Sequence, residues 1–574
     1  MLGSFTPLVE RELRLEVDER VDAEGRVVRP LDETAVAQAA QRLAALGAES
    51  IVIHFLHSYV NPAHELRAAE IVRRAWPNGY VTAGHTIISE YREYERGVTA
   101  AVNAAVRPVL QRYLERLRGE LATRGFTREL LVMQGNGGTV AASIAAEAAV
   151  NTVMSGPASG VIAAAYTARA AGYPNVVSYD MGGTSTDVAL IQNGLPQVSA
   201  ELELEYAMPI HVPMVDVHTI GAGGGSIARL NEAGLLQVGP QSAGAVPGPI
   251  CYGRGGTRVT ITDANLLLGR LDPRKLLAVD RPVTLEAVRD AIDRAIGRAL
   301  GLAPEQAAAA IVRVANDNMA GAIRMVSLAR GHDPRDFALF AFGGAGPLHA
   351  VALARELGIP RVLIPARPGL TNALGCVAAD VRHDFVRTVN RPLPALQRGL
   401  VRGVLEAQVA EGRAMIERER VRVEGIECVH RADMQFQGQS HILAVALPDA
   451  RIGPAALHRL FEEAYWQRFG VELKEIRPVL VGLHTAVIGK RPAVPLAALA
   501  AGAPGTVLAD AEIDRRAVWF DGAPIATPVY RRERLPCGAQ FAGPAIVEQL
   551  DATAVIEPGN RVAIDALGNL VVTL

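Results

Sequence analysis

A short apolar run that leads into a glycine-rich, acidic turn constrains this chain more than any other feature. Residues 175–179 predict a buried strand, and Asp180-Met181-Gly182-Gly183-Thr184-Ser185-Thr186-Asp187 follows at once. The two glycines let backbone N–H groups approach an anion closely, and the flanking carboxylates can hold a hydrated cation beside it. This combination suits nucleotide phosphates with Mg²⁺. A tight turn without a ligand is the alternative that the residues leave open.

Two further glycine turns also follow predicted strands. Gly221-Ala222-Gly223-Gly224-Gly225-Ser226 comes after residues 218–220, and Gly343-Gly344-Ala345-Gly346-Pro347 comes after a strand predicted over 337–342. Between them, helical spacing predicts a long helix over 304–330. A dinucleotide-binding fold is disfavoured because neither turn has the third glycine of that fingerprint. A Walker loop is disfavoured because no Lys follows the glycines.

Composition limits the partners of the chain. The 574 residues suffice for about three or four domains, and a net charge of −2 gives no bias toward nucleic acid. No apolar stretch reaches the roughly 20 residues that cross a bilayer, so we expect no membrane partner. The four cysteines have no CxxC spacing, which fits a reducing cytoplasm better than a disulfide framework or a zinc site.

The order of these elements resembles a known ATPase plan. An Asp-x-Gly-Gly-Thr turn, a long helix and a strand ending in Gly-Gly-Ala-Gly-Pro are similar to the actin, sugar-kinase and Hsp70 fold, where the first turn holds phosphates and the later one contacts adenosine. Longer strings resemble the hydantoinase A and 5-oxoprolinase family over nearly the whole chain. They are residues 216–228, 242–245, 247–249, 251–256, 262–265 and 342–350, with shorter matches at 59–65, 90–96 and 543–548.

The resemblance implies an α/β fold, with a two-lobed ATPase core and a C-terminal α/β and β-rich region. It divides the chain into the remainder of an N-terminal lobe (1–100), the ATPase core (101–390), a C-terminal α/β region (391–495) and a β-rich region (496–574). Residues 492–504, rich in Ala and Pro, are the linker candidate. Family members usually open with a first Asp-x-Gly-Gly-Thr loop, whereas here the similarity begins near Pro7 and nothing before Asp180 supplies that loop.

The resemblance also implies residue roles. Asp180 would hold Mg²⁺ through water or position the attacking group, and Asp187 would assist it as a second catalytic carboxylate. Asp187 can equally cap an element, the second glycine turn can be a bend between lobes, and Pro347 can simply start a helix. The predicted cofactor-binding residues are Gly182, Gly183, Thr184, Thr186, Gly223, Gly224, Gly225, Ser226, Gly343, Gly344, Ala345, Gly346 and Pro347.

The function implied first is ATP-dependent hydrolysis of a cyclic amide, of the hydantoin or 5-oxoproline type, through phosphorylation of its carbonyl oxygen. The cofactors would be ATP and Mg²⁺, and the chain would be the ATP-binding subunit of a hetero-oligomer with a hydantoinase B-type partner. An ATP-dependent ketone carboxylase subunit, for acetone or acetophenone, is the second possibility. The alternative from another functional class is an inactive, truncated scaffold that is not an enzyme.

Other reactive side chains carry weaker hypotheses. A strand over 51–57 would point His54 and His57 to opposite faces, which disfavours a shared metal. We expect Cys251 to be a packing residue, because no His–Asp arrangement surrounds it by spacing. Ser159 lies one place late for a nucleophile elbow. The acidic stretch at 90–96 reads as i,i+3 surface pairs of glutamates with Arg92 and Arg96.

Overall fold

The computed structural model describes residues 7–203, 208–276, 279, 283–473, 475–500 and 506–574. The chain forms two compact units, and each is built from segments that are not consecutive in sequence. Unit 1 contains residues 1–155, 198–214 and 379–492, and unit 2 contains 156–197, 215–378 and 493–574. The four consecutive segments expected from the sequence stay a prediction.

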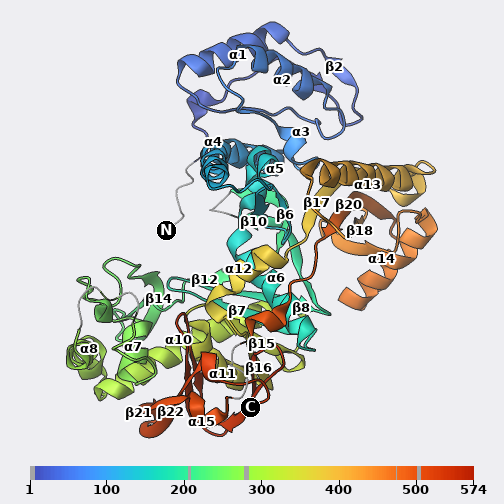
Figure 1. The fold of residues 1–574 in the computed structure, drawn as a ribbon. Coiled ribbons are helices and arrows are strands. Elements are labelled where there is room, and N and C mark those ends of the chain that lie inside the picture. Colours follow the sequence, from blue (N-terminus) through green and yellow to red (C-terminus); the bar gives the residue numbers. More distant parts are fainter. Residues whose placement is uncertain (1–6, 204–207, 277–278, 280–282, 474, 501–505) are drawn as a thin grey trace. The chain divides into compact units, whose positions relative to one another are not determined.

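Unit 2 is organised around a nine-stranded mixed sheet (Figure 1). Near its centre, β7 (Val176–Met181) pairs antiparallel with β8 (Thr186–Gln192) and parallel with β15 (Ala338–Phe342). Five of the six residues of β7 are buried, as expected for a strand covered on both faces. The predicted α/β fold is confirmed. The other strands are β12 (His218–Ile220), β9 (Leu195–Pro196), β16 (Arg361–Ile364), β27 (Leu570–Thr573), β26 (Arg561–Ile564) and β23 (Gln540–Ala542).

The long helix α10 (Pro304–Val326) packs on this sheet through a stripe of one-turn spacing. Ile311, Ala315, Met319 and Ile323 are all buried. The predicted helix over 304–330 is confirmed, with a short 3₁₀ turn at its end. The other helices of unit 2 are α6 (Ser155–Ala170), α7 (Ile261–Leu267), α8 (Leu285–Ile292), α9 (Arg298–Leu300), α11 (Gly346–Leu357), α12 (Thr371–Ala378) and α15 (Leu508–Ala511), and its hairpin is β13 (Ser226–Leu230) with β14 (Leu236–Ser242).

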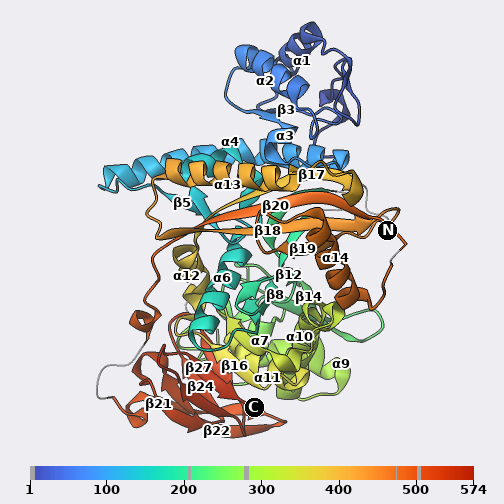
Figure 2. The same cartoon turned by 90° about the vertical axis from the view of Figure 1, so that its right-hand side faces the viewer.

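Unit 1 contains a six-stranded sheet with three long antiparallel strands (Figure 2). The strands β17 (Val381–Pro392), β20 (Pro478–Lys490) and β18 (Gly425–Phe436) lie next to one another in that order, and α13 (Leu400–Glu419) packs against β20 and β17. The remaining elements are β5 (Leu131–Met133), β6 (Thr139–Ala141), β19 (Leu443–Leu447), α5 (Ala142–Glu147) and α14 (Pro454–Phe469) in this part, and β1 (Arg20–Val21), β2 (Val27–Arg29), β3 (Ile51–Ile53), β4 (Val81–Ala83), α1 (Glu33–Ala45), α2 (Ala63–Ala75), α3 (Gly84–Ile87), α4 (Glu93–Thr123), β10 (Val198–Glu203) and β11 (Pro209–Val215) elsewhere in the unit.

Two local predictions in unit 1 are wrong. Helical spacing predicts a long helix over residues 97–119 with Pro108 as a possible break, but α4 continues through Pro108, because this residue is buried and tertiary packing offsets the roughly 3 kcal/mol that an interior proline costs. The strand β3 ends at Ile53 and does not reach His57, which lies in a turn with a φ of 59°. Neither His54 nor His57 lies on a strand, so the argument that a strand points them to opposite faces does not apply.

The C-terminal residues contribute to two different sheets of unit 2. Four strands form a separate antiparallel and parallel sheet, whereas β23, β26 and β27 extend the nine-stranded sheet that contains β7. Of the linker candidate, residues 501–504 lie outside the described residues, and Leu496–Leu499 form a 3₁₀ turn. The four strands are β21 (Glu512–Phe520), β22 (Ala523–Arg531), β24 (Ala545–Glu548) and β25 (Thr553–Ile556).

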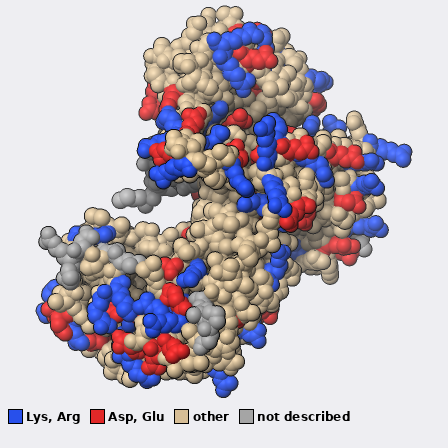
Figure 3. Space-filling model, viewed as in Figure 1, with Lys and Arg blue, Asp and Glu red and all other residues tan. Residues whose placement is uncertain are grey.

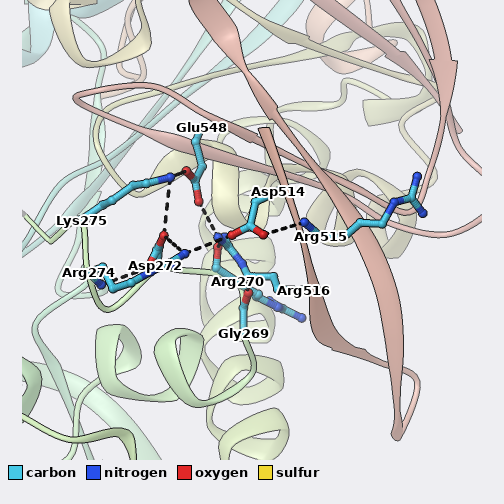
Figure 4. Close-up of polar contacts among 9 residues, drawn as sticks. All are labelled: Gly269, Arg270, Asp272, Arg274, Lys275, Asp514, Arg515, Arg516 and Glu548. Atoms are coloured by element: carbon cyan, nitrogen blue, oxygen red, sulfur yellow. Dashed lines mark hydrogen bonds and ion pairs between the residues drawn. The ribbon is translucent and has the colours of Figure 1, made fainter. Parts of the chain in front are cut away.

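A partly buried guanidinium joins this C-terminal sheet to the turn that follows α7 (Figure 4). Arg516 donates to the carbonyl oxygens of Gly269 (2.7 Å) and Arg270 (3.0 Å) and to Glu548 Oε1 (2.5 Å). The second oxygen of Glu548 accepts a hydrogen bond from Lys275 at 2.8 Å. The side chain of Glu548 is 6% exposed, so its charge depends on these two cations.

We therefore predict that Arg516→Ala lowers the free energy of unfolding of unit 2 by about 3 kcal/mol, because it leaves a buried carboxylate with one partner fewer and two carbonyl groups without a donor. Arg515→Ala is the matched control. Arg515 is mostly exposed and pairs with Glu512, three residues earlier on β21. Calorimetric unfolding of both variants measures the difference. Equal melting temperatures would contradict this role for Arg516.

Candidate functional site

The acidic glycine turn is the tip of the β7–β8 hairpin. Asp180 lies opposite Asp187 across the hairpin, and Met181 lies opposite Thr186. Because side chains alternate along strands, the two carboxylates share one face while Met181 and Thr186 point into the core, where both are fully buried. Directly opposite residues have Cβ atoms about 5 Å apart. The hairpin therefore presents two neighbouring carboxylates beside the loop of residues 182–185.

Asp180 lies at a crowded point of unit 2. Its Oδ2 accepts a hydrogen bond from Asn372 Nδ2 at 3.1 Å. Gly343, with a φ of +80°, passes so close that a Cβ there would lie 2.2 Å from Asp180 Oδ1. Burial raises the pKa of Asp180 to about 6; the Asn372 hydrogen bond lowers it, and the charge of Asp187 raises it further.

Asp187 has a similar environment. Its Oδ1 accepts a hydrogen bond of 2.5 Å from the hydroxyl of Thr219, which lies opposite it on β12. Burial raises the pKa of Asp187, and the Thr219 hydrogen bond offsets only part of that effect. The pKa values of both carboxylates are thus raised. This is expected where two like charges lie close together without a neutralising cation or proton.

The loop between the two strands is open on one side. No atom lies within 4 Å of the position that a Cβ would take at Gly182 or Gly183, so packing does not explain either glycine. The amide of Gly182 donates to Ser185 O, but among the described residues no acceptor is bonded to the amides of Gly183 and Thr184. The loop therefore has free donors next to two carboxylates.

The second glycine turn supports this loop from behind. Gly224 N–H donates to Gly182 O at 3.0 Å, and Gly225 N–H donates to Gly183 O at 2.7 Å. A Cβ at Gly223 would lie 2.5 Å from the amide nitrogen of Thr184, so this close approach requires glycine. Because these amides already have acceptors, the geometry favours a supporting role for the turn over direct phosphate contacts.

Two of the predicted cofactor-binding hydroxyls also lie inside the protein. Thr186 Oγ1 donates to Ala222 O at 2.5 Å, and Ser226 Oγ accepts a hydrogen bond from Gly223 N–H at 2.8 Å. Both side chains are fully buried. Their positions favour packing of the second turn against the hairpin.

The third glycine turn lies at the end of β15, next to the end of β7. Ala345 N–H donates to Met181 O at 3.0 Å, and the position of a Cβ at Gly346 is 3.5 Å from Met181 N. Gly346 begins α11, with Pro347 in its first turn as the alternative interpretation required. A Cβ built at Gly344 would lie 3.5 Å from Asp551 O. A helix N-terminus, which attracts anions, thus lies beside Asp180.

Sequence reasoning missed Asn372 and Thr219, the two partners of the carboxylates. Asn372 lies in the first turn of α12. Short polar side chains are common there because they cap helices, so the sequence showed no sign of a further role. Thr219 was part of a quoted motif but had no assigned role. The signal that could have found Thr219 is the predicted strand 218–220, which adds to the sheet at β8.

The other reactive side chains are in structural positions. Cys251 is buried, its backbone N–H donates to Asp263 Oδ1, and burial raises the pKa of its thiol well above the usual range, which makes it unreactive. Ser159 Oγ donates to Gly156 O inside α6. Arg96, expected in a surface pair, is fully buried instead: it pairs with Glu93 and donates to the carbonyl oxygens of residues 55 and 90.

Three further observations concern the described residues. Acidic and basic side chains are interspersed over the face shown in Figure 3. None of the described helices combines the length and apolar character needed to cross a bilayer. Among the same residues, no group of three His, Cys, Asp or Glu side chains is arranged around a common metal position.

Comparison with known proteins gives a consistent result along the chain. The model of the family described as Hydantoinase/oxoprolinase matches residues 96–385, that of its N-terminal region matches residues 2–76, and that of its C-terminal domain matches residues 404–570.

Individual relatives are similar over almost the whole chain. The caprolactamase subunit alpha of Pseudomonas jessenii is 38% identical over 97% of this chain and 81% of its own length. The acetophenone carboxylase gamma subunit of Aromatoleum aromaticum is 34% identical over 98% of this chain and 79% of its own length. The crystal structure of the ATP-dependent caprolactamase from Pseudomonas jessenii superposes with a TM-score of 0.89, at 35% identity, covering all of this chain and 84% of that one. This chain therefore belongs to the hydantoinase/oxoprolinase family.

Proposed function

We propose that this chain is the ATP-binding subunit of an enzyme that opens a cyclic amide. The observation that carries the proposal is the open loop of the β7–β8 hairpin, where the amides of Gly183 and Thr184, which have no acceptor among the described residues, lie beside Asp180 and Asp187. The name of a relative supports the reaction class, since the similar crystal structure is that of an ATP-dependent caprolactamase.

In this proposal the amides of Gly183 and Thr184 donate to phosphate oxygens of ATP. Gly182 and Gly183 keep the loop free of side chains, which lets the phosphates reach the backbone. The N-terminus of α11 adds a favourable electrostatic field at the same place. Gly343, Gly344 and Ala345 would lie along the nucleotide, and the second glycine turn would hold the loop in shape.

The two carboxylates fit a hydrated Mg²⁺. This ion usually keeps several waters and binds proteins through one or two carboxylates together with phosphates. Both Asp180 and Asp187 have raised pKa values because of burial, so a bound cation would stabilise their charged forms. Asp180, which is more strongly shifted, would hold the ion through water or orient the attacking oxygen.

The chemistry needs activation because an amide carbonyl is a poor electrophile. Transfer of the γ-phosphoryl group to the carbonyl oxygen forms an O–P bond and releases ADP. Water then attacks the carbon and the C–N bond of the ring breaks, so that the nitrogen leaves as a protonated amine and an acyl phosphate remains. A second water hydrolyses the acyl phosphate to a carboxylate and inorganic phosphate. The protein contributes positioning and electrostatic stabilisation, which dominate phosphoryl transfer. A hydantoinase B-type subunit would complete the reaction in a hetero-oligomer.

A ketone carboxylase subunit is the second candidate function. The acetophenone carboxylase gamma subunit is 34% identical to this chain, so the same ATP site could serve phosphorylation of an enolate oxygen. Assays with the partner subunit distinguish the two. Ring-opened product from a lactam or hydantoin supports hydrolysis, whereas ADP formation that requires a ketone and bicarbonate supports carboxylation.

The first prediction concerns Gly183→Ala. The added methyl meets no protein atom within 4 Å, and the backbone at Gly183 is not in the left-handed region, so stability should not fall. The methyl would occupy the open side of the loop, and we expect Mg·ATP binding to weaken at least about tenfold, the equivalent of one hydrogen bond or more. Titration calorimetry measures the binding, and thermal unfolding measures the stability.

Gly119→Ala is the control, because Gly119 also has no neighbour within 4 Å but lies on α4 of unit 1. It should leave Mg·ATP binding unchanged. Gly183→Ala with unaltered ATP affinity would contradict the loop assignment. A folded wild-type chain that binds no Mg·ATP would favour the inactive scaffold instead.

The second prediction concerns Asp180→Asn and pH. The pKa of Asp180 is about 6 in the folded chain and near 3.8 in the unfolded one, so the carboxyl stabilises the fold only while protonated, and this contribution is lost as pH rises through about 6. Asparagine removes that loss. The variant should therefore be more stable than the wild type by about 3 kcal/mol at pH 8 and by about half as much at pH 5.

Denaturant unfolding at the two pH values measures this difference, and ATP turnover by the variant should fall at least about a hundredfold at both. Asp317→Asn, an exposed position on α10, is the control and should change neither quantity. An Asp180→Asn variant that is destabilised at pH 8 would show that the carboxylate is stabilising rather than functional.

A further inference from the structure

Unit 2 contains an apolar cavity of about 300 Å³ that shares no lining residue with the three glycine turns. We call it the α12 cavity. It is lined by one residue of α6, by the segment from the end of β16 into α12, by the region of residues 494–499, and by the loop between β26 and β27. Small-molecule sites usually have volumes from about 300 Å³ upward. Its polar lining residues are Thr167, Arg367, Thr371 and Asn569, and the others are apolar.

Helix α12 forms one wall of this cavity. Thr371, Leu374 and Val377 line it at a spacing of three residues, so they lie on one side of the helix. Another side packs closely on α6 (Figure 2), since a Cβ at Gly375 would lie 1.8 Å from Ser159 O. Asn372, the donor to Asp180, belongs to the same helix. One helix thus lines the cavity and holds a partner of Asp180.

A buried hydroxyl in the lining has no partner. Thr167 is 3% exposed, and its Oγ1 makes no hydrogen bond to a described residue. The other two uncharged polar residues have acceptors: Thr371 Oγ1 donates to Pro368 O at 3.0 Å, and Asn569 Nδ2 donates to Asp565 Oδ2 at 2.7 Å. A buried polar group without a partner is costly, so Thr167 marks a place for a polar atom from outside the chain.

Arg367 supplies the charge of the lining. Its side chain is 35% exposed and forms an ion pair with Glu533, in which Nη1 is 3.8 Å from Oε1. That distance is too long for a hydrogen bond. A guanidinium has five N–H donors and can hold a carboxylate through two of them at once. The pair with Glu533 therefore leaves donors of Arg367 available to another acceptor.

We infer that the α12 cavity binds the anion of a medium-chain aliphatic acid. The carboxylate would accept hydrogen bonds from Arg367 and Thr167, and the chain would lie against the apolar lining. A cavity of about 150 Å³ holds benzene, so about twice that volume suits roughly ten non-hydrogen atoms, the size of octanoate. Leu370 and Val377 are each 56% exposed, and the chain would remove part of this apolar surface from water.

The lining disfavours other ligands. None of the described residues that line the cavity is acidic, so an amine or the ammonium group of an amino acid has no counter-ion among them. A nucleotide carries several negative charges and many polar atoms, which one arginine and one hydroxyl do not match. An apolar side chain of a partner protein would fill the space but would bring no anion for Arg367. Binding in the α12 cavity requires nothing of the ATP site.

The test is titration calorimetry of the full chain, without nucleotide, against octanoate, butyrate, 1-octanol and octylamine. We expect octanoate to bind with a Kd below about 1 mM. Butyrate lacks most of the chain, and 1-octanol and octylamine lack the negative charge, so each should bind at least about tenfold more weakly. Equal affinity for 1-octanol would contradict a carboxylate site. Equal affinity for butyrate would show a simple contact between an anion and arginine, and would also overturn the inference.

Two variants locate the binding. Arg367→Gln should weaken octanoate at least about fivefold because it removes the cation. Ala373→Phe should weaken it at least as much, since Ala373 lines the cavity and is exposed, so the ring takes up ligand space without disturbing the core. The matched controls are Arg298→Gln and Ala299→Phe on α9, where both residues are exposed and neither lines the cavity. They should leave octanoate affinity unchanged.

Thr167→Val separates binding from folding, because valine keeps the shape of threonine and lacks only the hydroxyl. Without ligand the melting temperature should not fall, since Thr167 Oγ1 has no hydrogen bond to lose among the described residues. The rise in melting temperature that octanoate causes should be smaller than in the wild type. A variant that melts lower without ligand would show that the hydroxyl has a partner inside the protein. That result, no octanoate binding, or binding that neither cavity variant weakens would overturn the inference.

Discussion

The partly buried carboxylate of Asp180 is the constraint around which unit 2 is arranged. Strand β7 is covered on both faces, and Asp180, next to its last residue, is partly buried; burial raises its pKa, so the position is costly for a negative charge. Gly343 passes against one of its oxygens and Asn372 donates to the other. The parallel pairing of β7 with β15 brings the third glycine turn to this point, and the antiparallel pairing with β8 brings Asp187. A site that tolerates so unfavourable a charge is one where function has opposed stability.

The elements around this point were predictable from the sequence because each has a strong local signal. A short apolar run before Asp180, one-turn spacing through α10 and a Pro after Gly346 need no tertiary information. The continuity of α4 through Pro108 was not predictable, since burial of that residue decides it. The partners of the carboxylates were also hidden, because Asn372 lies almost two hundred residues from Asp180 and only folding brings them together.

Residues 90–96 of unit 1 show the same limit more clearly. The sequence indicated an acidic stretch at 90–96, and helical spacing favoured surface pairs within it. Arg96 keeps its i,i+3 pair with Glu93 but is buried and also donates to Phe55 O, and Glu90 orients His211, which lies 121 positions further along the chain. Local spacing describes neighbours on one element, whereas a binding site is assembled from several. The same argument explains why the sequence did not reveal that Thr186 Oγ1 donates to Ala222 O inside the protein.

The pairing of β16 with β27 has a consequence for synthesis of the protein. One edge of β16 pairs with β27, where Ile364 lies opposite Leu570. The segment between these two residues includes most of the six-stranded sheet of unit 1. At about 5–20 residues per second, a ribosome needs about 10–40 s to make those roughly 200 residues. During that interval β16 pairs with β15 on one side only, and the backbone groups on its other edge can pair with another nascent chain. Chaperone dependence during translation, rather than low final stability, is therefore the expected weakness of this architecture.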